Sequence, residues 1–178
     1  MELYIIRHGE CVENTNLLTL LGVEEIKNLA NILKKEGPFD VIYSSSYRQA
    51  IDSAKLIERS TKTGLIIDKR LDERYISDEL KNDKEIYLNV NYEIKGKIES
   101  ISSHYERVSF FMDELKQKYS GEKIIIVAHM GTTQMLLYYV LGIPIEKISS
   151  IAFSIPMGGL IKIKDSTVLS PEGWTVFI

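Results

Sequence analysis

The sequence predicts an α/β fold with three layers, in which helices cover both faces of a mostly parallel central sheet. Short apolar segments rich in β-branched residues alternate along the chain with longer segments whose apolar residues recur at helical spacing. Residues 123–128 contain four β-branched residues in succession, which is typical of a central parallel strand. The length of 178 residues fits one domain, and we expect 1–178 to form it.

The first half of the chain alternates strands and helices. The first strand ends at an Arg-His-Gly sequence, and Gly37-Pro38 ends the first helix. Three serines, Ser44 to Ser46, follow the second strand, and their hydroxyls are suited to capping the next helix. The expected strands are 3–6, 39–43 and 65–67; the expected helices are 22–35 and a segment with Ala50, Ala54 and Ile57 on one face.

The second half begins with a polar, mixed segment, residues 74–98, which we expect to be a partly helical excursion over the core. A long helix over 99–119 precedes the 123–128 strand, and an apolar helix over 131–141 follows it, stopped by Gly142 and Pro144. The tail has three strand candidates, namely 150–155, 159–164 and 174–178.

Composition excludes several classes of protein. The 22 Lys+Arg and 25 Asp+Glu residues give a net charge of −3, which argues against a general nucleic-acid binder. The single cysteine, Cys11, excludes an intramolecular disulfide and a Cys-rich zinc site. The longest apolar stretch, 135–145, is too short to span a bilayer, and the N-terminus is wrong for a signal peptide. We therefore expect a cytoplasmic protein with no membrane or nucleic-acid partner; the oligomeric state is not predicted.

Two of the three histidines come directly after predicted strands. His8 follows the first strand and His129 follows the 123–128 strand, with Gly9 and Gly131 close behind them. In open α/β sheets, ligands bind beyond the carboxyl ends of the strands, and the helix after His129 directs its N-terminus to this same edge. The third histidine, His104, lies at apolar spacing within the 99–119 helix, where we interpret it as a packing residue.

These motifs resemble those of the histidine phosphatase superfamily, in its phosphoglycerate mutase-like branch. The sequence Arg7-His8-Gly9-Glu10, with Asn14 six residues after His8, resembles the first family motif, and Val127-Ala128-His129-Met130-Gly131 resembles the second. Between them, Leu71-Asp72-Glu73-Arg74 resembles the segment with the family's acidic proton donor. Glu99-Ser100 and Arg107-Val108 resemble the start of the helix before the last central strand.

The resemblance implies a site for phosphoryl transfer. His8 is the expected nucleophile, because a neutral imidazole attacks phosphorus near pH 7, and His129 is the expected second donor. Glu73 is the candidate general acid, with Asp72, Asp78 and Glu79 as alternatives. The expected phosphate-binding residues are Arg7, Asn14, Gln49 and Gly131.

One position departs from the family pattern. The family places a second phosphate-binding arginine directly before an alanine in the helix after the second strand, but here Gln49 precedes Ala50 and the arginine, Arg48, comes one residue early. One residue is about 100° of rotation on a helix, so Arg48 should point away from the pocket. We expect Gln49 to line the pocket and to limit turnover.

The resulting hypothesis is a metal-independent, cofactor-free phosphomonoester hydrolase that forms a phosphohistidine on a small phosphorylated metabolite. Two alternatives stay open. A phosphoglycerate mutase shares the motifs, although the family's mutases carry larger insertions than the short segment 74–98. A weakly active or non-catalytic binder of a phosphorylated ligand would account for glutamine at position 49.

Overall fold

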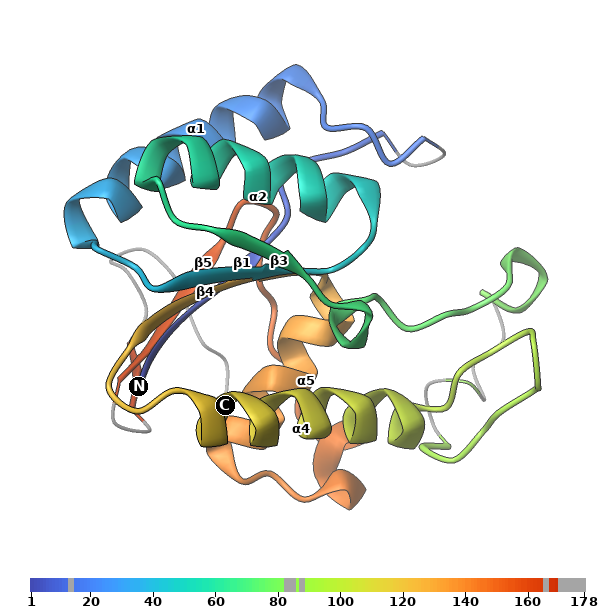
Figure 1. Ribbon diagram of the computed structural model, residues 1–178. Helices are drawn as coiled ribbons and strands as arrows, with labels where there is room; N and C mark the ends of the chain where they lie inside the picture. The colour runs from blue at the N-terminus through green and yellow to red at the C-terminus, as the bar shows by residue number, and fades with distance from the viewer. Residues whose placement is uncertain (13–14, 82–85, 87–88, 165–166, 170–178) are drawn as a thin grey trace.

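A computed structural model describes residues 1–12, 15–81, 86, 89–164 and 167–169. Figure 1 shows a central sheet with helices α1 and α2 on one face and α4 and α5 on the other, so the predicted three-layer α/β fold is confirmed. The helices are α1 (Leu20–Glu36), α2 (Arg48–Thr61), α4 (Ile101–Lys118) and α5 (Met130–Leu141).

The sheet has the strand order β3-β2-β4-β1-β5-β6. Its strands are β1 (Glu2–Arg7), β2 (Val41–Ser44), β3 (Leu65–Ile67), β4 (Lys123–Ala128), β5 (Leu160–Lys164) and β6 (Thr167–Leu169). The first four strands of this order run parallel, and β5 and β6 are antiparallel to their neighbours. The sheet is therefore mostly parallel, as the β-branched strands predict.

The register of the two central strands fixes the position of the site. Arg7 at the end of β1 pairs with Ala128 at the end of β4, so the two residues that follow, His8 and His129, leave the sheet side by side. Each face of the sheet has its own apolar core, one against α1 and α2 and the other against α4 and α5. Because both strands are buried on both faces, the edge that carries the histidines is held rigidly.

The structure corrects the expected strand at 150–155 and adds detail to the 74–98 segment. Residues 150–155 do not form a strand. Ser150 ends a 3₁₀ helix (Ile145–Ser150), and two carbonyls of the segment bond to side chains: that of Ile151 accepts from the hydroxyl of Tyr138, and that of Ile155 accepts from Arg7. The 74–98 segment contains a 3₁₀ turn at Asp78–Leu80 and an isolated bridge between Ile76 and Ile98. The candidate strand 174–178 lies outside the described residues. In the part of the chain that is described, no helix is long and apolar enough to cross a membrane.

Candidate active site

His8 is held at the end of β1 by its backbone and its ring. The backbone N–H donates to the Ala128 carbonyl at 3.0 Å, and Nδ1 donates to the Gly9 carbonyl at 2.8 Å. A carbonyl oxygen can only accept, so Nδ1 must carry the proton and Nε2 must be bare. Burial is the main cause that lowers the pKa of His8, followed by the charge of Arg7, while the bond to Gly9 opposes them. The ring is therefore neutral near pH 7, with a lone pair available on Nε2.

Gly9 is required for this arrangement. A Cβ at position 9 would lie 2.5 Å from the backbone oxygen of Gly22, closer than non-bonded atoms approach. The Gly9 N–H donates to the hydroxyl of Ser53, which itself donates to the Gln49 carbonyl one turn earlier in α2. The start of α1 and the first turns of α2 thus close over the His8 loop.

His129 lies beside His8, with ring centroids 5.1 Å apart, and is itself oriented by Ser45. The Ser45 hydroxyl has one hydrogen, which it donates to the Asp72 carboxylate at 2.9 Å. It can then only accept from His129, and the Nε2 of that ring lies 2.7 Å away. The proton of neutral His129 is therefore on Nε2, and Nδ1 is bare.

The surroundings of His129 keep it neutral in the free protein. Burial, followed by the charges of His8 and of Arg7, lowers its pKa to about 3. The ring of Tyr47 packs edge-on against it at 5.2 Å between centroids. A phosphoryl group beside Nδ1 would reverse the electrostatic balance, because a nearby anion favours the protonated ring.

Asp72 links the serines after β2 with helix α5. Its carboxylate accepts from the Ser45 hydroxyl, the Ser46 N–H at 2.7 Å and the Ser46 hydroxyl at 2.8 Å. Its carbonyl accepts from the Thr132 hydroxyl at 2.9 Å. Two of the three serines that were expected as helix caps, Ser45 and Ser46, thus bond to Asp72, and Ser45 also bonds to His129.

Arg7 lies at the end of β1, where one Nη donates to the Ile155 carbonyl at 2.8 Å. Its Nε is buried and has no hydrogen-bond partner, which is a rare condition for a guanidinium donor. An unsatisfied buried donor beside His8 is suited to an anionic ligand.

The structure separates Arg48 from Gln49 as the helical rotation predicts. Arg48 is exposed and pairs with Asp52 at 2.9 Å on the outer face of α2. Gln49 is buried, and its side-chain oxygen has no partner. Gln49 therefore occupies the inward position of this helix turn and Arg48 does not.

Glu73 is half-buried against the N-terminus of α5. Its carboxylate accepts from the Gly131 N–H at 2.8 Å and from the Arg74 N–H at 2.9 Å. Burial raises the pKa of Glu73 and outweighs these two bonds and the charges of Arg107 and Arg7, which lower it. A raised pKa allows a carboxyl to hold a proton near neutral pH.

Gly131 is placed next to Glu73. A Cβ at this position would lie 2.5 Å from Glu73 Oε1, so a larger residue would displace the carboxylate. The Gly131 N–H donates to the Glu73 carboxylate. The expected role of Gly131 in binding phosphate stays a prediction.

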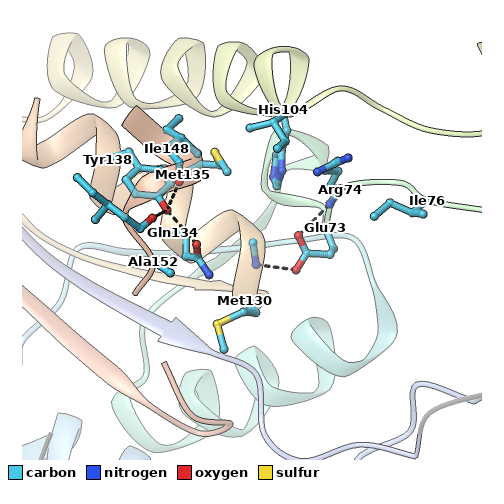
Figure 2. Close-up of a pocket in the computed structure, with 13 residues that line it drawn as sticks. Glu73, Arg74, Ile76, His104, Met130, Gln134, Met135, Tyr138, Ile148 and Ala152 are labelled. Carbon is cyan, nitrogen blue, oxygen red and sulfur yellow. Dashed lines mark hydrogen bonds between the residues drawn. The ribbon is translucent and has the colours of Figure 1, made fainter. Parts of the chain in front are cut away.

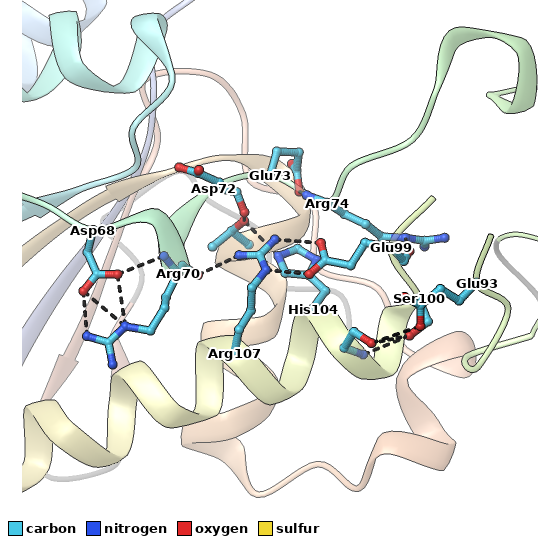
Figure 3. Close-up of polar contacts among 12 residues, drawn as sticks. Asp68, Arg70, Asp72, Glu73, Arg74, Glu93, Glu99, Ser100, His104 and Arg107 are labelled. Carbon is cyan, nitrogen blue, oxygen red and sulfur yellow. Dashed lines mark hydrogen bonds and ion pairs between the residues drawn. The ribbon is translucent and has the colours of Figure 1, made fainter. Parts of the chain in front are cut away.

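Arg107, on α4, binds the segment that leads to Asp72 and Glu73 (Figure 3). Arg107 makes a two-pronged ion pair with Glu99, at 2.6 and 2.9 Å, and donates to the Arg70 carbonyl at 2.7 Å. The segment that carries Asp72 and Glu73 is therefore bound to α4 through Glu99 and Arg107. These are the residues whose motifs resemble the start of the family's helix before the last central strand.

A cavity of about 400 Å³ opens beside Glu73, between α4, α5 and residues 148–152 (Figure 2). His104, predicted to be a packing residue of its helix, is fully buried and lies on the wall of this cavity. Asn14 lies outside the described residues, so its place in the site stays a prediction.

Sequence reasoning missed the positioning roles of Ser45, Asp72 and Tyr47. A signal existed for Asp72, which was one of the alternatives to Glu73, and for Ser45, which lies in the serine run after β2. Neither signal indicates that Ser45 and Asp72 form a hydrogen bond, because 27 residues separate them in the sequence.

The fold and the pair of histidines at the carboxyl edge of its sheet define the phosphoglycerate mutase-like class of α/β proteins. Residues 3–164 match the family described as "Histidine phosphatase superfamily (branch 1)". The chain therefore belongs to this family.

Individual relatives carry phosphatase names. A Hydrogenobacter thermophilus protein, provisionally named phosphoserine phosphatase 2, is 29% identical over 84% of this chain and 83% of its own length. The Escherichia coli adenosylcobalamin/alpha-ribazole phosphatase is 25% identical over 82% of each chain. The crystal structure of the alpha-ribazole phosphatase from Shigella flexneri has a TM-score of 0.76 and 24% identity, covering 96% of this chain and 95% of that one. The family and these names support a phosphatase.

Proposed function

We propose that this protein is a metal-independent phosphomonoester hydrolase that acts through a phosphohistidine on a small phosphorylated metabolite. The observation that carries the proposal is the His8 ring. Its Nδ1 is tied to the Gly9 carbonyl, and its bare Nε2 belongs to a neutral imidazole beside a second buried histidine. This is the state in which an imidazole is nucleophilic.

In the first step, His8 Nε2 forms a bond to phosphorus while the bond from phosphorus to the ester oxygen breaks. Arg7 and the amide of Gln49 donate to the equatorial oxygens, and Asn14 joins them by its place in the family motif. His129 becomes a donor when its Nδ1 takes a proton, because its Nε2 is committed to Ser45. The phosphoryl group arriving with one proton supplies it.

The ester oxygen leaves with a proton from Glu73, and the product alcohol departs. Glu73, now a carboxylate, draws a proton from the water that attacks the phosphohistidine. The bond from His8 Nε2 to phosphorus then breaks, and the inorganic phosphate that forms takes back the proton from His129 Nδ1. His8, Glu73 and His129 all return to their first state. The carboxyl is suited to both roles because burial raises its pKa, while the Gly131 and Arg74 amides stabilise the anion.

The proposal extends to the organisation of the chain, which we take as one domain of residues 1–178 with 74–98 passing over the site. The substrate class is a small phosphorylated metabolite. Relatives named for phosphoserine and for alpha-ribazole indicate the range to be screened.

The test is release of inorganic phosphate from a panel of phosphorylated metabolites, with EDTA present. We expect turnover that EDTA does not change and that His8→Ala abolishes. Acid-labile, base-stable radiolabel on the protein after rapid mixing with labelled substrate should report the phosphohistidine. Activity that survives in His8→Ala contradicts the proposal.

The same panel decides between the alternatives. Isomerisation of a phosphoglycerate without phosphate release would make the protein a mutase. Tight binding of a phosphorylated metabolite with no turnover would make it a binding protein, which the loss of an arginine at position 49 favours.

A further inference from the structure

Thr132, in the first turn of α5, joins this helix to the main chain just before Glu73. Its hydroxyl donates to the Asp72 carbonyl at 2.9 Å. Because that bond uses its one hydrogen, the Thr132 oxygen can only accept from His104, whose Nε2 lies 3.0 Å away. Burial, followed by the charges of two neighbouring arginines, holds the pKa of His104 well below its usual value, so the ring is neutral. Its single N–H is therefore on Nε2 and is donated to Thr132.

His104 and Thr132 are both fully buried, and the buried residues of α4 other than His104 are apolar. These apolar residues are Ile101, Val108, Phe111, Met112 and Leu115. A polar side chain among them costs free energy unless it is hydrogen-bonded, whereas an apolar side chain of similar volume would pack there without that cost. The bond to Thr132 therefore explains a histidine at position 104 better than packing does.

The bond from Thr132 acts on the backbone that leads into Glu73. The Asp72 carbonyl belongs to the peptide group between Asp72 and Glu73, and a peptide group is planar. A bond to this oxygen therefore fixes the plane from which the Glu73 Cα, and with it the side chain, departs. The Asp72 carboxylate does not depend on this bond, because it has three other donors, all from the serines after β2. Loss of the Thr132 hydroxyl should thus disturb the acid more than it disturbs the Asp72 side chain.

Helix α4 makes a second contact with the same segment. Arg107 lies three residues after His104, on the same face of the helix, and donates to the Arg70 carbonyl at 2.7 Å (Figure 3). The carbonyls of residues 70 and 72 are therefore both held from α4, the first directly and the second through Thr132.

We propose that His104, acting through the Thr132 hydroxyl, is a positioning residue that aligns Glu73 with the leaving oxygen of the substrate. The inference rests on the proposed phosphatase function. It predicts an effect that depends on the leaving group, because an alkoxide needs a proton from the acid, whereas p-nitrophenolate is stable enough to depart without one. A merely structural role of His104 and Thr132 predicts the same loss for both kinds of ester.

Thr132→Val removes the hydroxyl and keeps the shape of the side chain. The substrates are p-nitrophenyl phosphate and the alkyl phosphate of the metabolite panel that the unmodified protein hydrolyses fastest. We expect kcat/KM for the alkyl phosphate to fall about 10- to 100-fold, because a misplaced acid loses part of its contribution. For p-nitrophenyl phosphate the fall should be about threefold or less. Both values come from one preparation, so their ratio is independent of the fraction of folded protein.

Thr133→Val is the matched control for the loss of a buried hydroxyl. Thr133 is also fully buried, but its hydroxyl donates to the Met130 carbonyl inside α5. This variant should leave the ratio of the two kcat/KM values unchanged, and Thr132→Ser, which keeps the hydroxyl, should keep the ratio within about threefold of that of the unmodified protein. An equal fall for both esters in Thr132→Val, or the same change of ratio in Thr133→Val, would overturn the proposal.

Two variants of His104 test the donor itself. His104→Leu removes the N–H, whereas His104→Gln keeps an amide N–H at the position of Nε2. The ratio of kcat/KM for the alkyl phosphate to that for p-nitrophenyl phosphate should fall about 3- to 10-fold in His104→Leu, as for one neutral hydrogen bond, and by about twofold or less in His104→Gln.

The double variant His104→Leu/Thr132→Val shows whether His104 acts through Thr132. Its ratio should equal that of Thr132→Val alone, because the hydroxyl through which His104 acts is already gone. An unchanged ratio in His104→Leu, or a further fall in the double variant, overturns the positioning role. Absence of turnover of every alkyl phosphate by the unmodified protein contradicts the proposed function instead.

Discussion

The bond between Ser45 and His129 gives the sharpest test of how the site is held together. Ser45→Ala removes one hydroxyl group and leaves the packing around the Cβ atom unchanged. The Nε2–H of His129 then loses its acceptor in a fully buried environment, and Asp72 loses one of its donors. The backbone N–H of Tyr47, which donates to the same hydroxyl at 3.1 Å, loses its acceptor as well.

The magnitudes follow from burial. An unsatisfied buried donor costs about 1–3 kcal/mol, and a lost bond to a carboxylate costs about as much again. We therefore expect the free energy of unfolding to fall by roughly 2–4 kcal/mol, a large part of the stability of an ordinary domain. Loss of the fixed tautomer should also lower kcat about 10- to 100-fold, because His129 no longer presents Nδ1 to the phosphoryl group.

Ser46→Ala is the matched control. Ser46 also donates its hydroxyl to the Asp72 carboxylate but makes no bond to His129. Urea unfolding and steady-state phosphate release should show a smaller loss of stability for Ser46→Ala, about 1–2 kcal/mol, and a kcat within about threefold of the parent. Equal losses of kcat in the two variants would refute the idea that Ser45 orients His129.

Three further predictions concern the acid, the missing arginine and pH. Gly131→Ala should lower kcat at least about tenfold, because its Cβ would displace the Glu73 carboxylate, whereas Gly64→Ala, which has open space around it, should leave kcat unchanged. Gln49→Arg should raise kcat/KM about 10- to 100-fold by restoring a charged donor; an unchanged or lower rate would count against Gln49 as a pocket residue. Because the pKa of His129 is lowered to about 3 from 6.5, its contribution to stability is present above pH 6.5 and is lost as the pH falls toward 3. Urea unfolding should therefore show about 2–3 kcal/mol less stability at pH 4.5 than at pH 7, and His129→Gln should remove that part of the pH dependence.

Much of the fold was predictable because its elements are locally encoded. The β-branched side chains of β4 point to both faces of the sheet, so they are buried only where both faces are covered. The glycine and proline after α1 and α5 end those helices through their backbone conformations. The failure at 150–155 has the opposite origin. Phe153 and Ile155 are buried, but the carbonyls of Ile151 and Ile155 bond to the side chains of Tyr138 and Arg7, which no local pattern reveals.

The candidate site likewise has features that the sequence predicts and features that it does not predict. The adjacency of His8 and His129 follows from two strand ends and could be expected before any coordinates. The inward position of Gln49 and the outward position of Arg48 follow from helical rotation alone. By contrast, the bonds that set the tautomers join residues far apart in the chain, such as Ser45 with His129 and Thr132 with His104.

By itself the sequence determined which chemistry is available: two histidines at neighbouring strand ends, an arginine beside the first and a glutamine where a second arginine is usual. Tertiary structure alone decided which ring nitrogen carries each proton, that the Gly131 N–H bonds to Glu73, and that His104 is buried with its Nδ1 unpartnered. The physical reason is that strands and helices are specified by periodicity within a few residues. Protonation and hydrogen-bond direction depend instead on which distant groups are buried together.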